Sequence, residues 1–330
     1  MEEKINLYLT EEMYKLLTND MEAFGFVDAK NKPKRNNFIN TVIVNYFEEY
    51  EDKLNKNIND VTKLITDYLP KEKNIDYASL ANNLKDLLNK NNSSKQKDKK
   101  ICFALKPTKF SSNAINSINN YYLKFDSLSG YIRSLLYSYT TLSRVERELI
   151  VFKSSMAEIN KAIKNNKKLL LTTKKNKNTY PVCPYKMMQD KTGMYNYLLT
   201  YGSDGLPYSF RLQNIINLHC TNENQDKIPQ TVIQQLEKAF IDKTSFINKN
   251  TRPDDIVIEF TDNGFNQFNV IESNRPNYEI IDKNKVRFDC SLIHAYLYLR
   301  PFGADANVVS PLKLKKDLAV FYNNAAKSYK

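Results

Sequence analysis

The chain has 330 residues, with 49 Lys and Arg against 37 Asp and Glu, so its formal net charge is +12. This length indicates two or three domains, and a hydrophobic content of 42% is enough for packed cores. The mean hydropathy of −0.57 and the lack of an apolar run of about 20 residues exclude an integral membrane protein, and the N-terminus lacks the pattern of a signal peptide. We therefore expect a cytoplasmic protein whose positive field favours polyanions, nucleic acid before an anionic membrane.

A short unit occurs twice near the start of the chain. Residues 4–9 alternate polar and apolar side chains before Thr10, a good N-cap for an amphipathic helix. Residues 100–105 repeat the alternation, Pro107 opens the next helix, and residues 38–46 align with residues 131–139 as second helices. A strand and two helices bury too little surface to fold alone, so we expect both units to share one core with their strands paired antiparallel.

This pattern, with its Ser127-Leu128-Ser129-Gly130 segment before Tyr131-Ile132-Arg133, resembles the ribbon-helix-helix family. The resemblance implies that one chain makes a core that two chains normally make, and that the ribbon contacts nucleic acid. The alternative is an ordinary α+β core whose halves look alike by chance. The expected outward residues of the ribbon are Lys4, Asn6, Tyr8, Lys100, Cys102, Ala104 and Lys106.

Cys102 and Ala104 cannot reach base edges with hydrogen bonds, which weakens the case for sequence-specific DNA reading by this ribbon.

The middle of the chain is predicted to be helical and rich in lysine. Residues 48–89 fit a helix with a break at Pro70, residues 89–98 fit a flexible linker, and residues 143–167 fit one basic helix. Between Lys153 and Lys186 only Glu158 opposes the lysines, whereas a solvated helix face normally interleaves carboxylates. The lysines favour a polyanion partner, although a biased genome rich in Lys and Asn codons explains part of the charge.

Strands follow the basic helix. Alternating or apolar segments separated by turn residues predict a small β-barrel of five short strands, over residues 169–173, 180–187, 194–201, 208–211 and 215–220.

Two segments of these strands resemble the WYL domain. Gly193 is followed by Asn196-Tyr197-Leu198, and later by Phe210-Arg211-Leu212-Gln213-Asn214-Ile215. The family has Trp where Asn196 stands, Asp where Gln213 stands, and a second Arg where Asn214 stands. A polar surface around the Tyr and Arg positions of that family is thought to bind nucleic acid or a small anionic regulator. The missing Arg weakens the case for binding of a small anionic ligand more than the case for binding of a long polymer.

The C-terminal part resembles the extension that follows WYL domains. The resemblance rests on residues 300–311, which begin Arg300-Pro301-Phe302-Gly303, and on Leu312, Leu314, Leu318 and Tyr329. It implies an α+β module that mediates dimer contacts, joined to the barrel by a helix over residues 229–241.

We therefore predict an α+β chain. A tandem ribbon-helix-helix domain spans residues 1–142, a basic helix residues 143–167 and a WYL barrel of the SH3/Sm type residues 168–225. A connecting helix occupies residues 226–254, and the C-terminal extension residues 255–330. A ribbon-helix-helix head on a WYL body resembles the accessory proteins of type VI-D CRISPR-Cas loci. That resemblance implies a homodimer that binds single-stranded RNA and enhances an RNA-guided, RNA-cleaving nuclease.

The candidate binding residues combine stacking surfaces with cations. Tyrosines at the rim of the barrel can stack on bases, and Arg211 can clamp a phosphate with two hydrogen bonds, which Lys cannot. The alternatives are that the tyrosines fill the core and that Arg211 makes an internal salt bridge. The candidates are Arg211, Tyr197, Tyr195, Tyr201, Lys174, Lys175, Lys186, Lys168, Asn6, Tyr8, Arg35 and Arg133.

The sequence offers little for catalysis. Four single cysteines and two isolated histidines indicate neither a zinc site nor a disulfide framework, and phosphate loops and nucleophile elbows are missing. We expect no enzyme, no cofactor and no metal. The main hypothesis is the RNA-binding accessory protein, with the nuclease as a possible partner. The alternative, less favoured, is a DNA-binding transcription regulator whose WYL domain senses a ligand.

Overall fold

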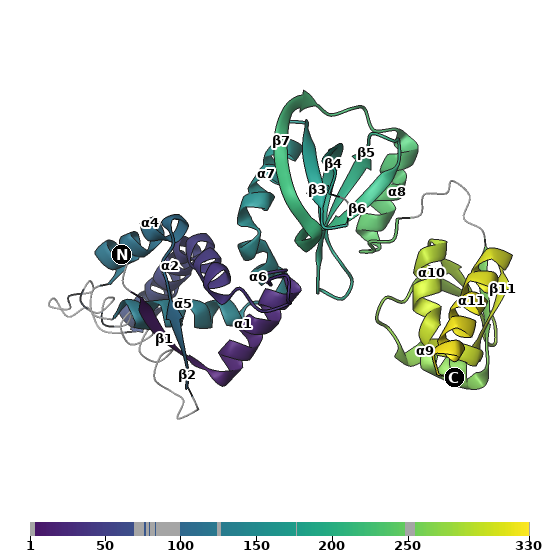
Figure 1. Cartoon of the computed structure of the whole chain (residues 1–330), viewed down its shortest axis with the longest axis horizontal. Helices are drawn as coiled ribbons and strands as arrows, with labels where there is room; N and C mark the ends of the chain where they lie inside the picture. The colour runs from purple at the N-terminus through teal and green to yellow at the C-terminus, as the bar shows by residue number, and fades with distance from the viewer. Residues whose placement is uncertain are drawn as a thin grey trace. The chain divides into compact units, whose positions relative to one another are not determined.

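The computed structural model describes residues 4–68, 76, 79, 83, 100–123, 127–175, 177–247 and 255–329. The chain divides into two compact units, Met1–Lys153 and Ser154–Lys330. It is a mixed α+β protein, as predicted, and its described residues form one two-stranded, one five-stranded and one four-stranded sheet (Figure 1).

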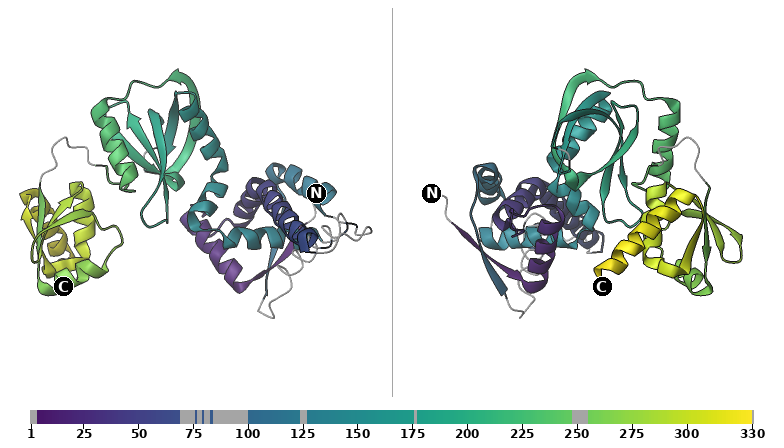
Figure 2. Two further views of the ribbon diagram at one scale, coloured as in Figure 1. Left: turned by 180° about the vertical axis from the view of Figure 1, so that it is seen from behind. Right: turned by 45° about the vertical axis from the view of Figure 1, so that its right-hand side comes forward.

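The first unit is built on a ribbon of two strands that are distant in sequence. Strand β1 (Ile5–Thr10) pairs antiparallel with β2 (Lys100–Leu105), and Leu7 lies opposite Phe103 at the centre (Figures 1 and 2). Helices follow each strand, and those after β2 are separated by a short π-helical turn. These elements are α1 (Glu11–Ala23), α2 (Arg35–Tyr68), α4 (Lys109–Ser117), η1 (Ile118–Tyr122) and α5 (Leu128–Thr141).

Helices α1, α4 and α5 begin directly after residues whose side chains act as N-caps. The Thr10 hydroxyl accepts a hydrogen bond from the Met13 amide at 3.2 Å, and the Ser127 hydroxyl accepts one from the Gly130 amide at 3.0 Å. Helix α4 begins after the N-cap Thr108, whose side chain forms a capping box with Ser111.

Both halves of the first unit share one apolar core, as the repeat predicts. Leu7 and Leu105 of the ribbon are fully buried against the second helices. At the centre, Tyr46 of α2 and Tyr139 of α5 meet edge to face with ring centroids 6.3 Å apart. Burial of this shared apolar surface is the main stabilising term, because neither half contains enough of it alone.

The helix predicted over residues 143–167 is in fact two helices, α6 (Arg144–Val151) and α7 (Lys153–Lys164). They meet at Phe152, whose φ of −103° and ψ of 28° lie outside the helical range. The Phe152 ring packs edge-on against Phe24 at 6.2 Å, so a core contact interrupts a pattern that looks continuous in sequence.

The predicted helix over residues 48–89 corresponds to the end of α2 as far as Tyr68. The predicted break at Pro70 and the linker over residues 89–98 lie outside the described residues.

All five strands predicted for the second unit are present. They are β3 (Lys167–Thr173), β4 (Tyr180–Gln189), β5 (Asn196–Gly202), β6 (Pro207–Arg211) and β7 (Ile215–Asn224), ordered β6-β5-β4-β3-β7 and antiparallel. The predicted closed barrel is wrong for the described strands, because β6 and β7 are the two edges and do not pair. The turn η2 (Leu212–Asn214) carries the chain across the end of the sheet, and β7 pairs with β3 instead.

Helix α8 (Gln230–Ile241) packs on one face of this sheet, where Val232 and Leu236 contact Met188 and Leu199.

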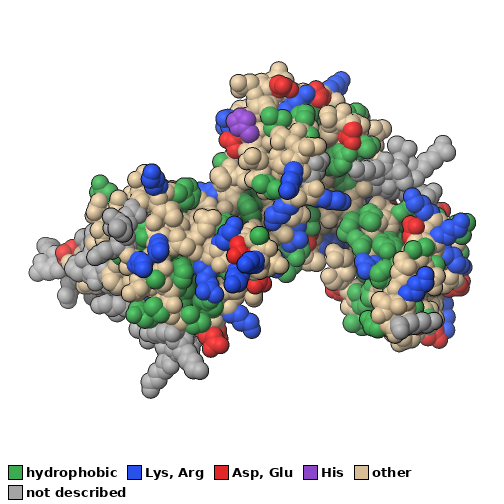
Figure 3. Space-filling view, in the orientation of Figure 1, with side chains coloured by type: hydrophobic (Ala, Val, Ile, Leu, Met, Phe, Trp, Pro, Cys, Tyr) green, Lys and Arg blue, Asp and Glu red, His purple; other side chains and the backbone are tan. Residues whose placement is uncertain are grey.

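The C-terminal segment forms the four-stranded sheet, ordered β11-β8-β10-β9, with its own core around Phe268. A Cβ on Gly264 would lie 2.2 Å from the Asp305 carbonyl oxygen, so only glycine permits α9 to approach η3. Hydrophobic side chains gather over α10 (Figure 3), where Ile293 and Leu297 are 55% and 39% exposed. The elements are β8 (Ile256–Phe260), α9 (Asp262–Val270), β9 (Asn277–Asp282), β10 (Lys285–Asp289), α10 (Leu292–Leu299), η3 (Arg300–Asp305), β11 (Ala306–Ser310) and α11 (Leu312–Ser328).

Within the described part of the chain, none of the helices combines the length and the apolar character needed to cross a membrane.

Candidate nucleic-acid interface

Arg211 and Tyr195 form a stacked pair at one end of the five-stranded sheet. Arg211 is the last residue of β6 and lies opposite Tyr197 of β5 in the strand register. Its guanidinium carbon lies 3.2 Å from the centroid of the Tyr195 ring. Stacking uses the flat face of a guanidinium and none of its N–H groups, which lie in the plane. The stack therefore fixes the plane in which Arg211 can donate to an anion.

The turn before β5 holds Tyr195 in place. One carboxylate oxygen of Asp190 accepts hydrogen bonds from the amides of Met194 and Tyr195 at 2.9 and 3.1 Å. Gly193 sits in this turn with a φ of +64°, a conformation that glycine adopts without strain. The Gly193 signal in the sequence thus corresponds to the turn that positions the stacked tyrosine.

Lys174 is a second cation beside Arg211. It directly follows β3, and its backbone amide donates to the carbonyl of Asn214 at 2.9 Å. Burial, and after it the positive charge of Arg211, hold the pKa of Lys174 below its usual range. A bound phosphate would offset this repulsion between two cations, so the pair is suited to anion binding. Lys174 and its neighbour Lys175 both keep exposed surface.

Two of the candidate tyrosines pack mainly against α8. Tyr197 and Tyr201 are half-buried beside the cluster that contains Leu199 and Leu236. Burial raises the pKa of Tyr197, although its hydrogen bond with Ser245 acts in the opposite direction. The structure therefore favours the core alternative for these two side chains, and leaves Tyr195 beside the cations.

Lys168 and Lys186 already have carboxylate partners. Lys168 Nζ lies 3.0 Å from Asp226, and Lys186 Nζ lies 2.6 Å from Glu237 of α8. Lys186 also lies 4.8 Å from the centroid of the Phe240 ring. These contacts neutralise both lysines locally, so they fit a phosphate site less well than Lys174 and Lys175 do.

The other four candidates belong to the first unit. Asn6 and Tyr8 point outward from the ribbon, opposite Ala104 and Cys102, and Tyr8 is 46% exposed. Arg35 starts α2 with its guanidinium carbon 5.2 Å from the centroid of the Tyr14 ring.

Arg133 lies on α5, where its Nε atom is buried without a hydrogen-bond partner among the residues that the structure describes.

An aromatic cluster on the face of β6 opposite to Arg211 escaped sequence reasoning. The Phe210 ring lies 6.1 Å from Tyr180 and 5.9 Å from Tyr208, nearly parallel to the latter. The Tyr208 hydroxyl donates to Asp204, and this hydrogen bond, with burial, raises the pKa of Tyr208 to about 12. The alternation of Tyr208 and Phe210 along β6 was a signal for this cluster, but Tyr180 belongs to another strand.

A cavity of about 480 Å³ in the second unit also lay beyond sequence reasoning, because its walls come from several segments. Tyr195 and Tyr197 line it together with Lys243, Phe246 and His294. The His294 ring stacks on Phe246 with centroids 4.7 Å apart, and burial lowers its pKa.

No protein-family model matches this chain, and no curated protein matches it. Among solved structures, one titled "Crystal structure of a CRISPR Cas-related protein" is similar over 100% of this chain and 94% of its own. Its TM-score is 0.72 and its sequence identity is 17%. At that identity the two chains are shown to share a fold from end to end.

A second solved structure, proteasome accessory factor B/C (PafBC) of Arthrobacter aurescens, aligns with 71% of this chain and 39% of its own. The identity is 11% and the TM-score is 0.27.

Proposed function

We propose that this chain is a non-enzymatic accessory protein of a CRISPR-Cas system that binds single-stranded RNA. The observation that carries this proposal is the fold shared over the whole chain with a CRISPR Cas-related protein. The paired ribbon and the Gly193, Tyr197 and Arg211 positions support the finer assignment to a ribbon-helix-helix head and a WYL body, as found in type VI-D accessory proteins.

Single-stranded RNA is the favoured polymer because of the residues around Arg211. Arg211 and Lys174 supply two adjacent positive charges, and Tyr195 supplies an aromatic ring stacked on Arg211. The Phe210 cluster supplies further rings on the opposite face of β6. Unpaired bases can stack on aromatic side chains, whereas bases inside a duplex cannot. In the first unit, Cys102 and Ala104 leave half of the outward ribbon face without groups that read base edges.

Two measurements test the proposal. Binding to single-stranded RNA and to duplex DNA of equal length, at one salt concentration, should favour RNA, and affinity for RNA should fall steeply with added salt. Added protein should also increase RNA cleavage by a type VI-D nuclease. Equal or stronger binding to duplex DNA would contradict the RNA assignment, and unchanged cleavage would contradict the accessory role.

The cavity beside Tyr195 supports a second candidate, a DNA-binding regulator whose second unit senses a small ligand. This candidate predicts specific binding to an operator palindrome near its own gene. A CRISPR array beside the gene would favour the first candidate instead.

A further inference from the structure

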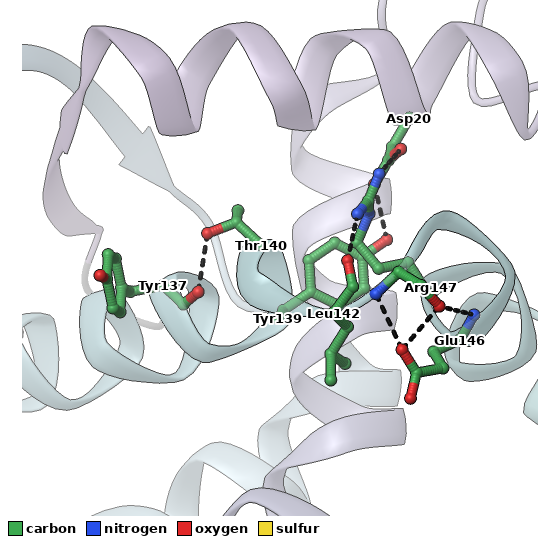
Figure 4. A network of polar contacts seen from close by, with 8 residues as sticks. Asp20, Tyr137, Tyr139, Thr140, Leu142, Glu146 and Arg147 are labelled. Carbon is green, nitrogen blue, oxygen red and sulfur yellow. Dashed lines mark hydrogen bonds and ion pairs between the residues drawn. The ribbon is translucent and has the colours of Figure 1, made fainter.

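Buried polar contacts join the two halves of the first unit, namely residues 4–68 and residues 100–153. Asp20 of α1 is 3% exposed and accepts a hydrogen bond from the Tyr139 hydroxyl at 3.0 Å. Its carboxylate also accepts two from Arg147, from Nε at 2.7 Å and Nη2 at 3.1 Å (Figure 4). Arg147 Nη1 donates to the Leu142 carbonyl oxygen at 2.5 Å, which fixes the guanidinium in place.

Glu51 and Asn40 of the first half also form buried contacts with the second half. Glu51 of α2 is 2% exposed and accepts a hydrogen bond from the Tyr131 hydroxyl at 2.7 Å. Asn40, 1% exposed, accepts one from the fully buried Ser111 hydroxyl, and its amide donates to the Lys106 carbonyl oxygen at 3.0 Å. Asp20, Glu51 and the Asn40 side-chain oxygen therefore accept from donors of the second half, while the Asn40 amide group donates to a carbonyl oxygen of that half.

The repeat shows what each side chain would meet if a half paired with a second copy of itself. When the N-caps Thr10 and Thr108 are superposed, Ile118 corresponds to Asp20, and Met13 corresponds to Ser111. All of these positions are buried, so the equivalence holds structurally as well as in sequence.

The second helices give the remaining equivalences. Phe38 corresponds to Tyr131 and Tyr46 to Tyr139, and the first half has no arginine after Arg35 at the start of α2, so nothing in it corresponds to Arg147. Two first halves would therefore leave Asp20 without a guanidinium, Glu51 facing Phe38 and Asn40 facing Met13. Two second halves would place Arg147 against Ile118.

Such mismatches are costly, because removing one partner of a buried ion pair leaves an uncompensated charge in the core. We propose that these contacts make the two halves recognise each other and reject a second copy of themselves. The surface of residues 4–68 thus fits one kind of partner, the segment of residues 100–153, whose hydroxyls and guanidinium match its buried acids and amide.

Cysteines on the ribbon can report which strands pair. Tyr8 lies opposite Cys102, so oxidised Tyr8→Cys should form a disulfide within one chain. If β2 paired with β2 of a second copy, the register would centre on Phe103 and set residue 102 opposite residue 104. The Cys that replaces Ala104 should therefore form a disulfide with Cys102 of a second chain only when like halves pair. Adding Cys102→Ser to that variant removes this disulfide and is the control.

The test is Ala104→Cys in two backgrounds on a non-reducing gel. The native background should give at most a trace of covalent dimer. The apolar background, Asp20→Ile, Arg147→Leu, Glu51→Leu and Tyr131→Phe, should give about tenfold more of it, because replacing both partners removes the mismatch while the core stays packed.

Thermal unfolding shows whether the variant with the apolar background folds. If that variant does not fold, the double substitution Asp20→Ile and Arg147→Leu is used as the apolar background instead. A folded apolar background without extra covalent dimer would overturn the proposal. A native background that already cross-links would overturn it equally.

Discussion

The two units use arginine in different ways. In the first unit, Arg147 is buried, joins the halves through Asp20 and holds the end of α5 through the Leu142 carbonyl (Figure 4). In the second unit, Arg211 stacks on Tyr195 at the end of a sheet and lies beside another cation, Lys174. The contacts of Arg147 with a carboxylate and a carbonyl stabilise the fold, whereas Arg211 and Lys174 form the cation pair that we propose as part of the RNA site. Substitution by Lys should therefore lower the stability of the fold at Arg147 and the affinity for RNA at Arg211.

The largest effect is expected at Arg147. Arg147→Lys keeps the charge but cannot reproduce the two-pronged contact with Asp20 or the bond to Leu142. The free energy of unfolding should fall by about 3 kcal/mol and the melting temperature by several degrees, because a buried carboxylate loses hydrogen bonds. Thermal unfolding measures this, and Arg287→Lys, at an exposed ion pair, is the control. RNA affinity well below the melting temperature should stay unchanged, and a loss there would mean that Arg147 does more than hold the core.

A second prediction concerns how two copies meet. If the first unit pairs its own halves, a homodimer should form through the C-terminal segment, with the exposed Ile293 and Leu297 of α10 as contacts. Ile293→Lys with Leu297→Lys should then halve the mass measured by light scattering, since charges are excluded from apolar interfaces. Val270→Lys changes another exposed apolar residue of the same segment and should leave the mass unchanged. A double variant that remains dimeric would place the contact elsewhere.

The third prediction concerns Arg211. Arg211→Lys should weaken binding of single-stranded RNA by about tenfold, because the planar fork and the stack on Tyr195 are lost while the charge remains. The melting temperature should not change. Fluorescence anisotropy with labelled RNA and thermal unfolding of the same sample measure both quantities. A lower melting temperature with unchanged affinity would show that Arg211 is a structural residue and that the interface lies elsewhere.

The smallest effects separate the lysines from one another. Lys174→Gln and Lys175→Gln should each lower the slope of log affinity against log salt by about one unit, if each lysine contacts one phosphate. Lys168→Gln and Lys186→Gln, at sites already paired with Asp226 and Glu237, should leave this slope unchanged. Equal losses at all four positions would indicate a diffuse field in place of a defined site.

Lys174 also gives a prediction about pH. Its pKa is lowered in the folded protein, so charging it costs folding free energy below that pKa, and the cost disappears as the pH rises through it. Lys174→Gln should therefore raise the melting temperature slightly at pH 7 while weakening RNA binding. Native RNA affinity should begin to fall at a pH below the usual lysine range. A lower melting temperature for Lys174→Gln at pH 7 would contradict this account.

Predictions from the sequence were confirmed where the periodicity of apolar residues and the position of turn residues determine the structure. The alternation in residues 4–9 and 100–105 predicted the ribbon, and all strands of the five-stranded sheet were found from apolar segments and turn residues. It failed where a distant contact intervenes. Phe152 packs on Phe24 and divides one predicted helix into two, and β7 pairs with β3, which leaves the predicted barrel open.

For the candidate interface, the sequence by itself determined which residue types are present and which face of each strand they occupy. Only the tertiary structure decided which charges are compensated, because Glu237 lies 51 positions from Lys186 and Asp20 lies 127 positions from Arg147. Periodicity describes neighbours along an element, whereas compensation of a charge depends on whatever packs within a few ångströms of it. The same repeat that predicted two similar halves therefore gave no sign of the unlike polar side chains that join them.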